Sequence, residues 1–309
     1  ELGGLHSLAD FENVKVQYVE PTYADLKDGS TLIELPPNGQ GLTAIMMKKM
    51  MQFCNIDRFS AGSFERVHLE AEIAKIAYSA RNNFIGDPNF SEVKQNVFLD
   101  DLYLEQLSKE ISLGKLLNHN LEDDFFTRNK DTVLICAADN AGNAISLIFS
   151  TFHAFGSGLS SKKYGLLFHN RGAGFVLKKN HPNELLGGKR PLHTIIPAIL
   201  KEKNGSIMPF GVMGGQYQAC GHARILSNIK DYGMGFQEAL NFPRSFYFDG
   251  ILNIERGYKK DIKEKLTEIG YKVEEATIPI GGAQLVRIDS TGVLIGASDP
   301  RKDGCALGY

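Results

Sequence analysis

Cysteine, long apolar runs and an excess of charge of one sign are all scarce in this sequence of 309 residues. Its four cysteines lie far apart without a C-x-x-C pair, so neither a disulfide framework nor a zinc site is predicted, and a reducing, cytoplasmic location is expected. No apolar run approaches the roughly 20 residues that a membrane span needs. The formal net charge of −2 provides no field to gather nucleic acid or an anionic membrane. We therefore expect small molecules or other protein as partners.

Common cofactor and metal motifs are also missing. Gly187-Gly-Lys189 lacks the upstream glycine and the following Ser or Thr of a P-loop, and no H-E-x-x-H motif occurs. Gly156-Ser-Gly158 lacks the third glycine of a dinucleotide-binding turn. Cys220 and His222 lie two positions apart on a predicted helix and therefore point in different directions, which makes them a poor metal pair. The sequence predicts neither a cofactor nor a bound metal.

The first part of the chain is predicted to form a hairpin followed by helices. With 43% hydrophobic and 23% charged residues, the composition is that of a globular protein. Extended runs at residues 14–19 and 30–35 flank Lys27-Asp-Gly29, where glycine supplies a positive φ, and predict a hairpin. The polar, acidic stretch 118–130 is predicted to be an exposed linker. Apolar residues at helical spacing predict helices over residues 42–54, 64–81 and 100–111, the second with an apolar stripe of Leu69, Ile73, Ile76 and Ala80.

The pattern changes at Thr132. Residues 132–138 and 144–150 are β-rich runs around Asp139-Asn-Ala-Gly-Asn143, a strong hairpin signal, and we expect both runs to be buried on both faces. Strands grouped between helices, with hairpin connections, predict an α+β fold in which stacked sheets are covered by helices. Further strands are predicted at residues 165–168, 195–200, 207–212, 272–274, 284–288 and 293–296, and helices at 217–231 and 259–269.

A threonine at the start of a strand suits one specific chemistry. A free hydroxyl is a poor nucleophile, but an N-terminal threonine can use its own α-amine as base. The reference pKa of that amine, about 7.7 to 8.0, leaves a neutral fraction near pH 7. The amine exists only if the preceding peptide bond is cut. Thr132 follows the linker and opens a strand as such an enzyme requires, although threonine also begins strands for conformational reasons alone.

An ordered series of motifs along almost the whole chain resembles the γ-glutamyltransferase family. Before Thr132 it comprises Gly3-Gly4, Ser7-Leu-Ala-Asp-Phe11 and the Pro36-Pro37 loop. From Thr132 onwards it comprises Asp139-x-x-Gly-Asn143, Phe155-Gly-Ser-Gly158, Gly165-Leu-Leu, Gly188-Lys-Arg-Pro191, Met213-Gly-Gly215, Ala239-x-x-x-Pro243-Arg244 and Gly296-Ala-Ser-Asp-Pro-Arg301.

This resemblance implies an N-terminal-nucleophile fold, an αββα sandwich, made by a precursor that cuts itself before the threonine. It implies that residues 1–131 correspond to the C-terminal part of the large subunit and residues 132–309 to the small subunit. An upstream large-subunit segment is then expected to be absent from this sequence. A homodimer of such heterodimers is a further expectation from the resemblance.

The same resemblance assigns catalytic roles. Thr132 takes the place of the nucleophile, and Ser150 takes the place of a second hydroxyl beside it. Gly214 and Gly215 match the glycine pair whose backbone N–H groups form the oxyanion hole, where glycine allows the substrate to approach closely. The simpler alternatives are a polar residue at a strand end for Ser150 and a tight turn for the two glycines.

The substrate-binding positions depart from the family pattern. Gly174 stands where a γ-glutamyl enzyme carries the carboxylate that binds the substrate ammonium group, and residues 140–183 contain no Asp or Glu. His193 and Thr194 replace the serine pair that holds the α-carboxylate. Arg171 can grip a carboxylate through two parallel hydrogen bonds, unless it is a solvated surface cation. His193 can donate to the same carboxylate or simply cap a strand.

Several segments resemble one branch of the family, the oxamate-amidohydrolase-like enzymes. We therefore expect an amide hydrolase that forms an acyl-enzyme on Thr132 and acts on a small anionic amide such as oxamate. A γ-glutamyltransferase or γ-glutamyl hydrolase acting on glutathione-like donors, and an inactive fragment or structural subunit, stay open as alternatives. The segments are Thr132-Val133, Pro36-Pro-Asn-Gly-Gln-Gly41, His169-Asn-Arg-Gly172, Lys189-Arg-Pro-Leu-His-Thr194 and Gly221-His222.

Overall fold

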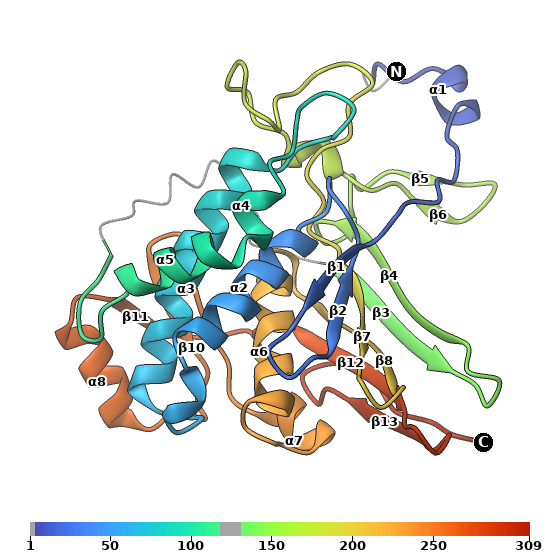
Figure 1. Cartoon of the computed structure of the whole chain (residues 1–309). Helices are drawn as coiled ribbons and strands as arrows, with labels where there is room; N and C mark the ends of the chain where they lie inside the picture. Colours follow the sequence, from blue (N-terminus) through green and yellow to red (C-terminus); the bar gives the residue numbers. More distant parts are fainter. Residues whose placement is uncertain (1–3, 118–130) are drawn as a thin grey trace.

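The computed structural model describes residues 4–117 and 131–309, with only the backbone of Asp131. Its centre is a six-stranded antiparallel sheet in the order β1-β2-β7-β8-β12-β13 (Figure 1). The first two strands precede Thr132 in the sequence and the other four follow it, so one sheet joins the two parts of the chain. The strands are β1 (Thr22–Asp25), β2 (Thr31–Glu34), β7 (Pro197–Lys201), β8 (Ile207–Met213), β12 (Gly282–Ile288) and β13 (Leu294–Ser298).

The hairpin predicted near the start exists, but with a different first strand. β1 pairs with β2 with Asp25 opposite Thr31, and Leu26 N donates to Ser30 O at 2.8 Å to close the turn. Residues 14–19, predicted as the first strand, form no strand and are exposed. The prediction is wrong at this point because a short turn pairs the residues that immediately flank it.

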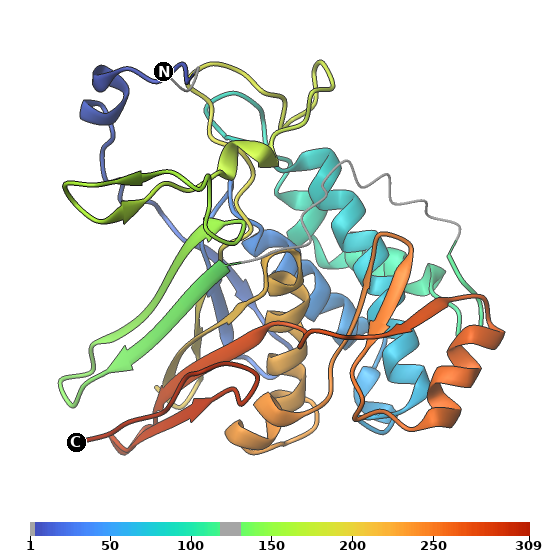
Figure 2. The same ribbon diagram turned by 180° about the vertical axis from the view of Figure 1, so that it is seen from behind.

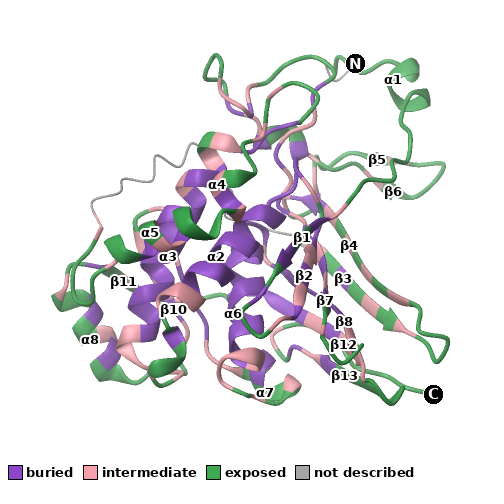
Figure 3. Ribbon diagram, viewed as in Figure 1, coloured by how far each residue is buried: buried purple, intermediate pink, exposed green. Residues whose placement is uncertain are grey.

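Helices cover one face of the six-stranded sheet. α2 and α6 pack on each other and contact β2 and β8, and α2 is covered in turn by α3, α4 and α5. Every residue of α2 from Gly41 to Met51 is therefore buried (Figure 3). The apolar stripe predicted on α3 is confirmed, since all four of its residues are buried. The helices are α2 (Gly41–Phe53), α3 (Phe64–Phe84), α4 (Asn96–Leu99), α5 (Asp101–Glu110) and α6 (Gln218–Lys230).

A smaller unit packs against α3. Its three-stranded sheet has the order β11-β10-β9, and α8 connects the parallel pair β10 and β11. This connection is a crossover, so the expectation of hairpin connections alone is wrong here. β9, β10 and α7 are short elements that the sequence pattern does not predict. The elements are α7 (Phe236–Asn241), β9 (Ser245–Phe248), β10 (Ile251–Ile254), α8 (Lys260–Glu268) and β11 (Lys272–Glu275).

The predicted hairpin after Thr132 is confirmed and forms a second layer. β3 (Asp131–Ala138) and β4 (Ala144–Phe152) pair with each other and pack on β8 (Figure 2). Along β8, Phe210 faces the helices, where its ring lies 4.9 Å from that of His222. The next residue, Gly211, faces the hairpin and contacts Leu134. The hairpin therefore lies on the face of the sheet opposite the helices.

The outer face of this hairpin is exposed, which contradicts the expectation of burial on both faces. Inward-facing Leu134 is only 5% exposed, and its neighbours along the strand point away from the sheet. Among the described residues no helix packs extensively on this face. The α+β class is confirmed, with helices, sheet and hairpin as three successive layers. The outward-facing apolar residues are 49–65% exposed and comprise Val133, Ile135, Ile145, Leu147 and Phe149.

Short elements complete the fold. The predicted linker at residues 118–130 lies outside the described residues. No helix in the described ranges is both long and apolar enough to cross a bilayer. The short elements are α1 (Leu8–Glu12), β5 (Ser160–Ser161), β6 (Leu166–Leu167) and the 3-10 helices η1 (Ile56–Arg58), η2 (Arg171–Gly174) and η3 (Gly215–Tyr217).

Candidate active site

Thr132 and Ser150 lie side by side at the open end of the hairpin. The strand register places them opposite each other, and Thr132 Oγ1 donates a hydrogen bond to Ser150 Oγ at 3.1 Å. Ser150 Oγ also accepts from the backbone N–H of Phe152 at 3.0 Å. The structure therefore brings together the two hydroxyls that the sequence analysis assigns to catalysis, and both residues are half-buried.

Contacts between the layers bring Thr132 toward the end of β8. Leu134 packs on Gly211. Cys136 Sγ contacts the backbone oxygen of Gln284 at 3.5 Å, and Gln284 is the residue of β12 that pairs with Gly211. Ser146 Oγ, opposite Cys136, donates to Phe210 O at 2.8 Å. Since β3 and β8 run in opposite senses through these contacts, the start of β3 lies near the residues that follow Met213.

The turn after β8 contains the predicted oxyanion glycines. Gly214 and Gly215 have φ angles of 135° and 56°, in the region that favours glycine. A Cβ added to Gly214 would lie 2.9 Å from Gly281 Cα, so the close packing of two glycines also excludes a side chain. Among the described residues, neither amide donates in a loop or turn hydrogen bond, whereas Gly214 O accepts from Tyr217 N at 3.2 Å. Neither N–H group is therefore occupied by another loop or turn of the described chain.

Arg171 is buried beside Ser150. At 3% exposure it is not the solvated cation considered above, and its guanidinium contacts Ser150 O at 3.5 Å and the Phe152 ring at 5.0 Å. Burial lowers the pKa of Arg171 to about 10, so it stays charged at neutral pH. Within the described part of the chain no carboxylate acts on it, and its Nη1 atom has no hydrogen-bond partner. Gly174, at the end of η2, provides no carboxylate.

His193 and Thr194 are held by the loop before α2. His193 N donates to Asn38 O at 2.9 Å, and His193 Nδ1 lies 2.8 Å from both the Asn38 side-chain nitrogen and Pro191 O. Burial, followed by the charge of Arg171, lowers the pKa of His193 to about 4, so its ring is neutral at pH 7. Thr194 is buried and its carbonyl accepts from Gln40 Nε2 at 2.8 Å. Both residues are thus anchored to residues 38–40, the loop before α2.

His153 is a polar residue in this region that the sequence analysis does not single out. Asn170 Oδ1 accepts from His153 N at 3.1 Å, which directs Asn170 Nδ2 to donate to His153 Nδ1 at 2.6 Å. The ring proton is then on Nε2, which is buried and has no partner among the described residues. Only the folded chain brings His153 and Asn170 together, since no local motif links positions so far apart.

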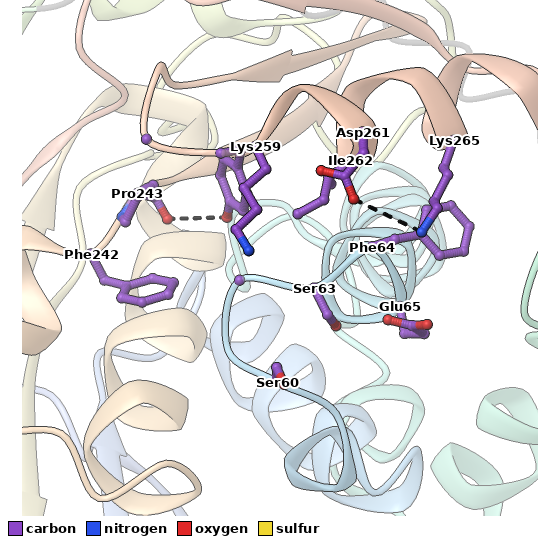
Figure 4. A pocket seen from close by; sticks show the side chains of 13 residues that line it. Ser60, Ser63, Phe64, Glu65, Phe242, Pro243, Lys259, Asp261, Ile262 and Lys265 are labelled. Atoms are coloured by element: carbon purple, nitrogen blue, oxygen red, sulfur yellow. Dashed lines mark hydrogen bonds and ion pairs between the residues drawn. The ribbon is translucent and has the colours of Figure 1, made fainter.

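A separate cavity of about 520 Å³ lies between the starts of α3 and α8 (Figure 4). Two of its polar side chains are paired within the lining: Tyr258 Oη donates to the backbone oxygen of Pro243 at 3.1 Å, and Lys265 lies 4.0 Å from Asp261. None of the predicted site residues lines it. The lysines and acidic residues that line the cavity are solvent-accessible, and it contains neither Thr132 nor Arg171, so we do not take it as the candidate active site.

Comparison with known proteins agrees with this arrangement. The glutathione hydrolase-like YwrD proenzyme of Bacillus subtilis (strain 168) is 30% identical over 99% of this chain and 59% of its own length. The oxamate amidohydrolase proenzyme of Klebsiella pneumoniae subsp. pneumoniae is 29% identical over 100% of this chain and 59% of its own length. The crystal structure of cephalosporin acylase from Bacillus halodurans has 31% identity and a TM-score of 0.84, covering 99% of this chain and 56% of that one.

The chain thus spans about 59% of the length of both curated relatives. The fold similarity supports the N-terminal-nucleophile architecture expected from the motifs. The family model described as Gamma-glutamyltranspeptidase matches residues 1–309. On these grounds, the chain belongs to the γ-glutamyltranspeptidase family.

Proposed function

We propose that this chain is the nucleophile-bearing part of a self-processing amide hydrolase. The observation that carries the proposal is the hydrogen bond of 3.1 Å between Thr132 and Ser150, beside a buried arginine that has no acidic partner among the described residues. Two relatives whose names call them proenzymes, one of them an amidohydrolase, support it. Cleavage before Thr132 would divide the chain into the segments 1–131 and 132–309.

The proposed reaction uses groups that the site already aligns. After cleavage, the α-amine of Thr132 takes the hydroxyl proton and Oγ1 attacks the amide carbonyl carbon. The N–H groups of Gly214 and Gly215 donate hydrogen bonds to the carbonyl oxygen as it becomes negatively charged. The proton passes to the leaving ammonia or amine as the C–N bond breaks. Water then attacks the acyl-enzyme and releases the acid, while Ser150 keeps the Thr132 hydroxyl oriented through its hydrogen bond.

The proposed substrate is a small amide that carries a carboxylate and no amine, such as oxamate. Arg171 is charged and buried, and a substrate carboxylate would satisfy its Nη1 atom, which has no partner among the described residues. The neutral ring of His193 can donate to the same group, and the buried Thr194 lies next to it. A substrate ammonium group would instead meet a buried cation without a carboxylate, which is costly.

The outer face of the β3–β4 hairpin supports a further protein partner. Its five outward-facing apolar residues form a contiguous surface of the kind that monomers rarely expose. The curated relatives are longer than this chain. We include in the proposal that an upstream large-subunit segment packs on this face and completes the outer layer, and that two such units form the homodimer expected from the resemblance.

Mass spectrometry and ammonia release test the nucleophile. The natural protein, with whatever chain precedes residue 1 retained, should separate into two polypeptides, the second beginning at Thr132, and should release ammonia from oxamate. Thr132→Ala should stay uncut and lose at least about 10³-fold of the activity, as expected for removal of a nucleophile. The control is Thr31→Ala, because Thr31 also begins a strand.

The assignments of the nucleophile and of the substrate can fail separately. If an N-terminus at Thr132 never appears while the protein is folded, the assignment of the nucleophile is wrong. If γ-glutamyl-p-nitroanilide is hydrolysed efficiently and oxamate is not, the substrate assignment fails and the Thr132 mechanism stands.

A further inference from the structure

A buried glutamine connects the two halves of the proposed site. Gln40 begins the turn into α2 and is fully buried. Its Nε2 atom donates to Thr194 O at 2.8 Å and to Gly215 O at 3.1 Å. One side-chain amide therefore holds the backbone of a proposed substrate-binding residue and the backbone of the proposed oxyanion turn.

Arg81 of α3 orients the side-chain amide of this glutamine through a hydrogen bond. Arg81 Nη1 donates to Gln40 Oε1 at 3.0 Å and also to the side-chain oxygen of Gln216. The carbonyl of Gln216 accepts in turn from the hydroxyl of Tyr78. All four side chains are buried. Since Oε1 of Gln40 accepts from Arg81, its Nε2 is fixed as the donor toward the turn.

The glycine turn needs such support because it has no side chains of its own. Glycine permits many backbone conformations, so a Gly-Gly peptide can rotate and direct its N–H groups away from the site. A donor in an oxyanion hole acts only when it is held in place before the reaction. The hydrogen bond from Gln40 fixes the carbonyl of Gly215, directly after the peptide whose N–H is a proposed donor.

We infer that Gln40 is a positioning residue that keeps the N–H groups of Gly214 and Gly215 directed at the reacting carbonyl. The inference rests on the proposed function. Gln40 does not touch the substrate in this arrangement, because its polar atoms are occupied by Thr194, Gly215 and Arg81. Its loss should lower the rate of steps that pass through an oxyanion and leave binding of the substrate ground state nearly unchanged.

Two variants separate this role from packing. Gln40→Met keeps the volume and removes all polar contacts. Gln40→Glu still accepts from Arg81 but cannot donate to the two carbonyls while it is ionised. The matched control is Gln218→Met, because Gln218 is equally buried and bonds the backbone of Ile196 but not the glycine turn.

The probe is p-nitrophenyl acetate, an activated ester that needs a nucleophile and an oxyanion hole but no carboxylate recognition. Rates are measured in the natural protein and divided by the fraction of chains that begin at Thr132, obtained by intact mass. Both Gln40 variants should lose about 10- to 100-fold in kcat, somewhat less than removal of a whole donor, with KM within about twofold of the wild type. Gln218→Met should keep its kcat.

Three results would contradict the inference. An unchanged kcat in Gln40→Met, or an equal loss in Gln218→Met, would show that Gln40 only fills space. A Gln40 variant that folds but is never cut would place the residue in maturation instead of the oxyanion hole. Failure of the proposed function is distinguishable, because the wild type would then show no ester hydrolysis that depends on Thr132.

Discussion

Buried arginines on the two sides of the molecule differ in their partners. On the helical side, Arg66 and Arg224 both contact Glu70, and Arg244 contacts Asp299. On the hairpin side, Arg171 is buried to a similar degree but contacts a carbonyl and an aromatic ring. A buried charge without a partner is costly, so natural proteins rarely keep one without a function. Among the described residues, this difference is what supports the proposal that Arg171 binds a substrate carboxylate.

Replacing one arginine from each side should lower stability in one case and activity in the other. Arg244→Ala removes one of the two arginines that pair with buried Asp299, the other being Arg301, and also removes the donor to Ile280 O, so it should cost about 3 kcal/mol in the free energy of unfolding. Arg171→Ala should leave that free energy nearly unchanged, because no carboxylate of the described residues is left unpaired. It should lower kcat/KM for oxamate by about 30-fold or more, corresponding to about 2 to 5 kcal/mol. Chemical denaturation and ammonia release measure the two effects.

Pyruvamide is the control for the second loss. It has the size of oxamate, with a methyl group in place of a carboxylate oxygen, and its turnover should hardly change in Arg171→Ala. Equal losses on both amides would make Arg171 structural. A large loss of stability in Arg171→Ala would remove the contrast between the two sides.

The two faces of the β3–β4 hairpin allow a smaller comparison. Leu134 is 5% exposed against the main sheet, and the adjacent Ile135 is 54% exposed on the outer face. Leu134→Ala should cost about 2 to 4 kcal/mol in the free energy of unfolding, because it removes buried methyl groups from a packed layer. Ile135→Ala should cost less than about 1 kcal/mol in residues 1–309 alone. Denaturant unfolding of both variants measures this difference.

Repeating the measurement in the natural protein tests the proposed outer layer. If an upstream segment covers this face, Ile135→Ala should become nearly as costly as Leu134→Ala. A small cost in both settings would show that the outer face faces solvent.

Most elements could be predicted from the sequence, because apolar spacing reflects burial along one helix or strand. The stripe on α3 and the hairpin after Thr132 are examples. The exposure of the outer face of the hairpin could not be predicted. Its apolar residues indicate burial, but their pattern does not show which segment covers them. The adjacency of Thr132 and Ser150 follows from the strand register once the turn at Asp139 is recognised.

Other features of the site depend on contacts that no local pattern encodes. The absence of Asp and Glu from residues 140–183 indicated an anionic substrate, but the burial of Arg171 could be established only from the fold. Gln40 lies in a motif that the sequence analysis noted, yet its partners Thr194 and Gly215 come from distant parts of the chain. Such roles appear only when the chain is folded.

The smallest expected effect concerns the protonation of His193. Its pKa is about 4 in the folded protein and 6.5 in the reference state, chiefly because of burial and secondly because of Arg171, with His169 and Arg190 acting in the same direction. Between these values the unfolded chain binds one proton more than the folded chain. The free energy of unfolding therefore falls as the pH is lowered from about 6.5 to 4.

His193→Gln, which cannot titrate, should remove this component of the pH dependence. Since His193 is only half-buried by exposed area, we expect the wild type to lose on the order of 1 to 2 kcal/mol more than the variant over that interval. Denaturant unfolding at several pH values measures the difference, with His6→Gln on the exposed N-terminal segment as control. In Arg171→Ala the pKa of His193, followed by NMR, should rise because a neighbouring positive charge is gone. An unchanged pKa would show that the two residues do not share one site.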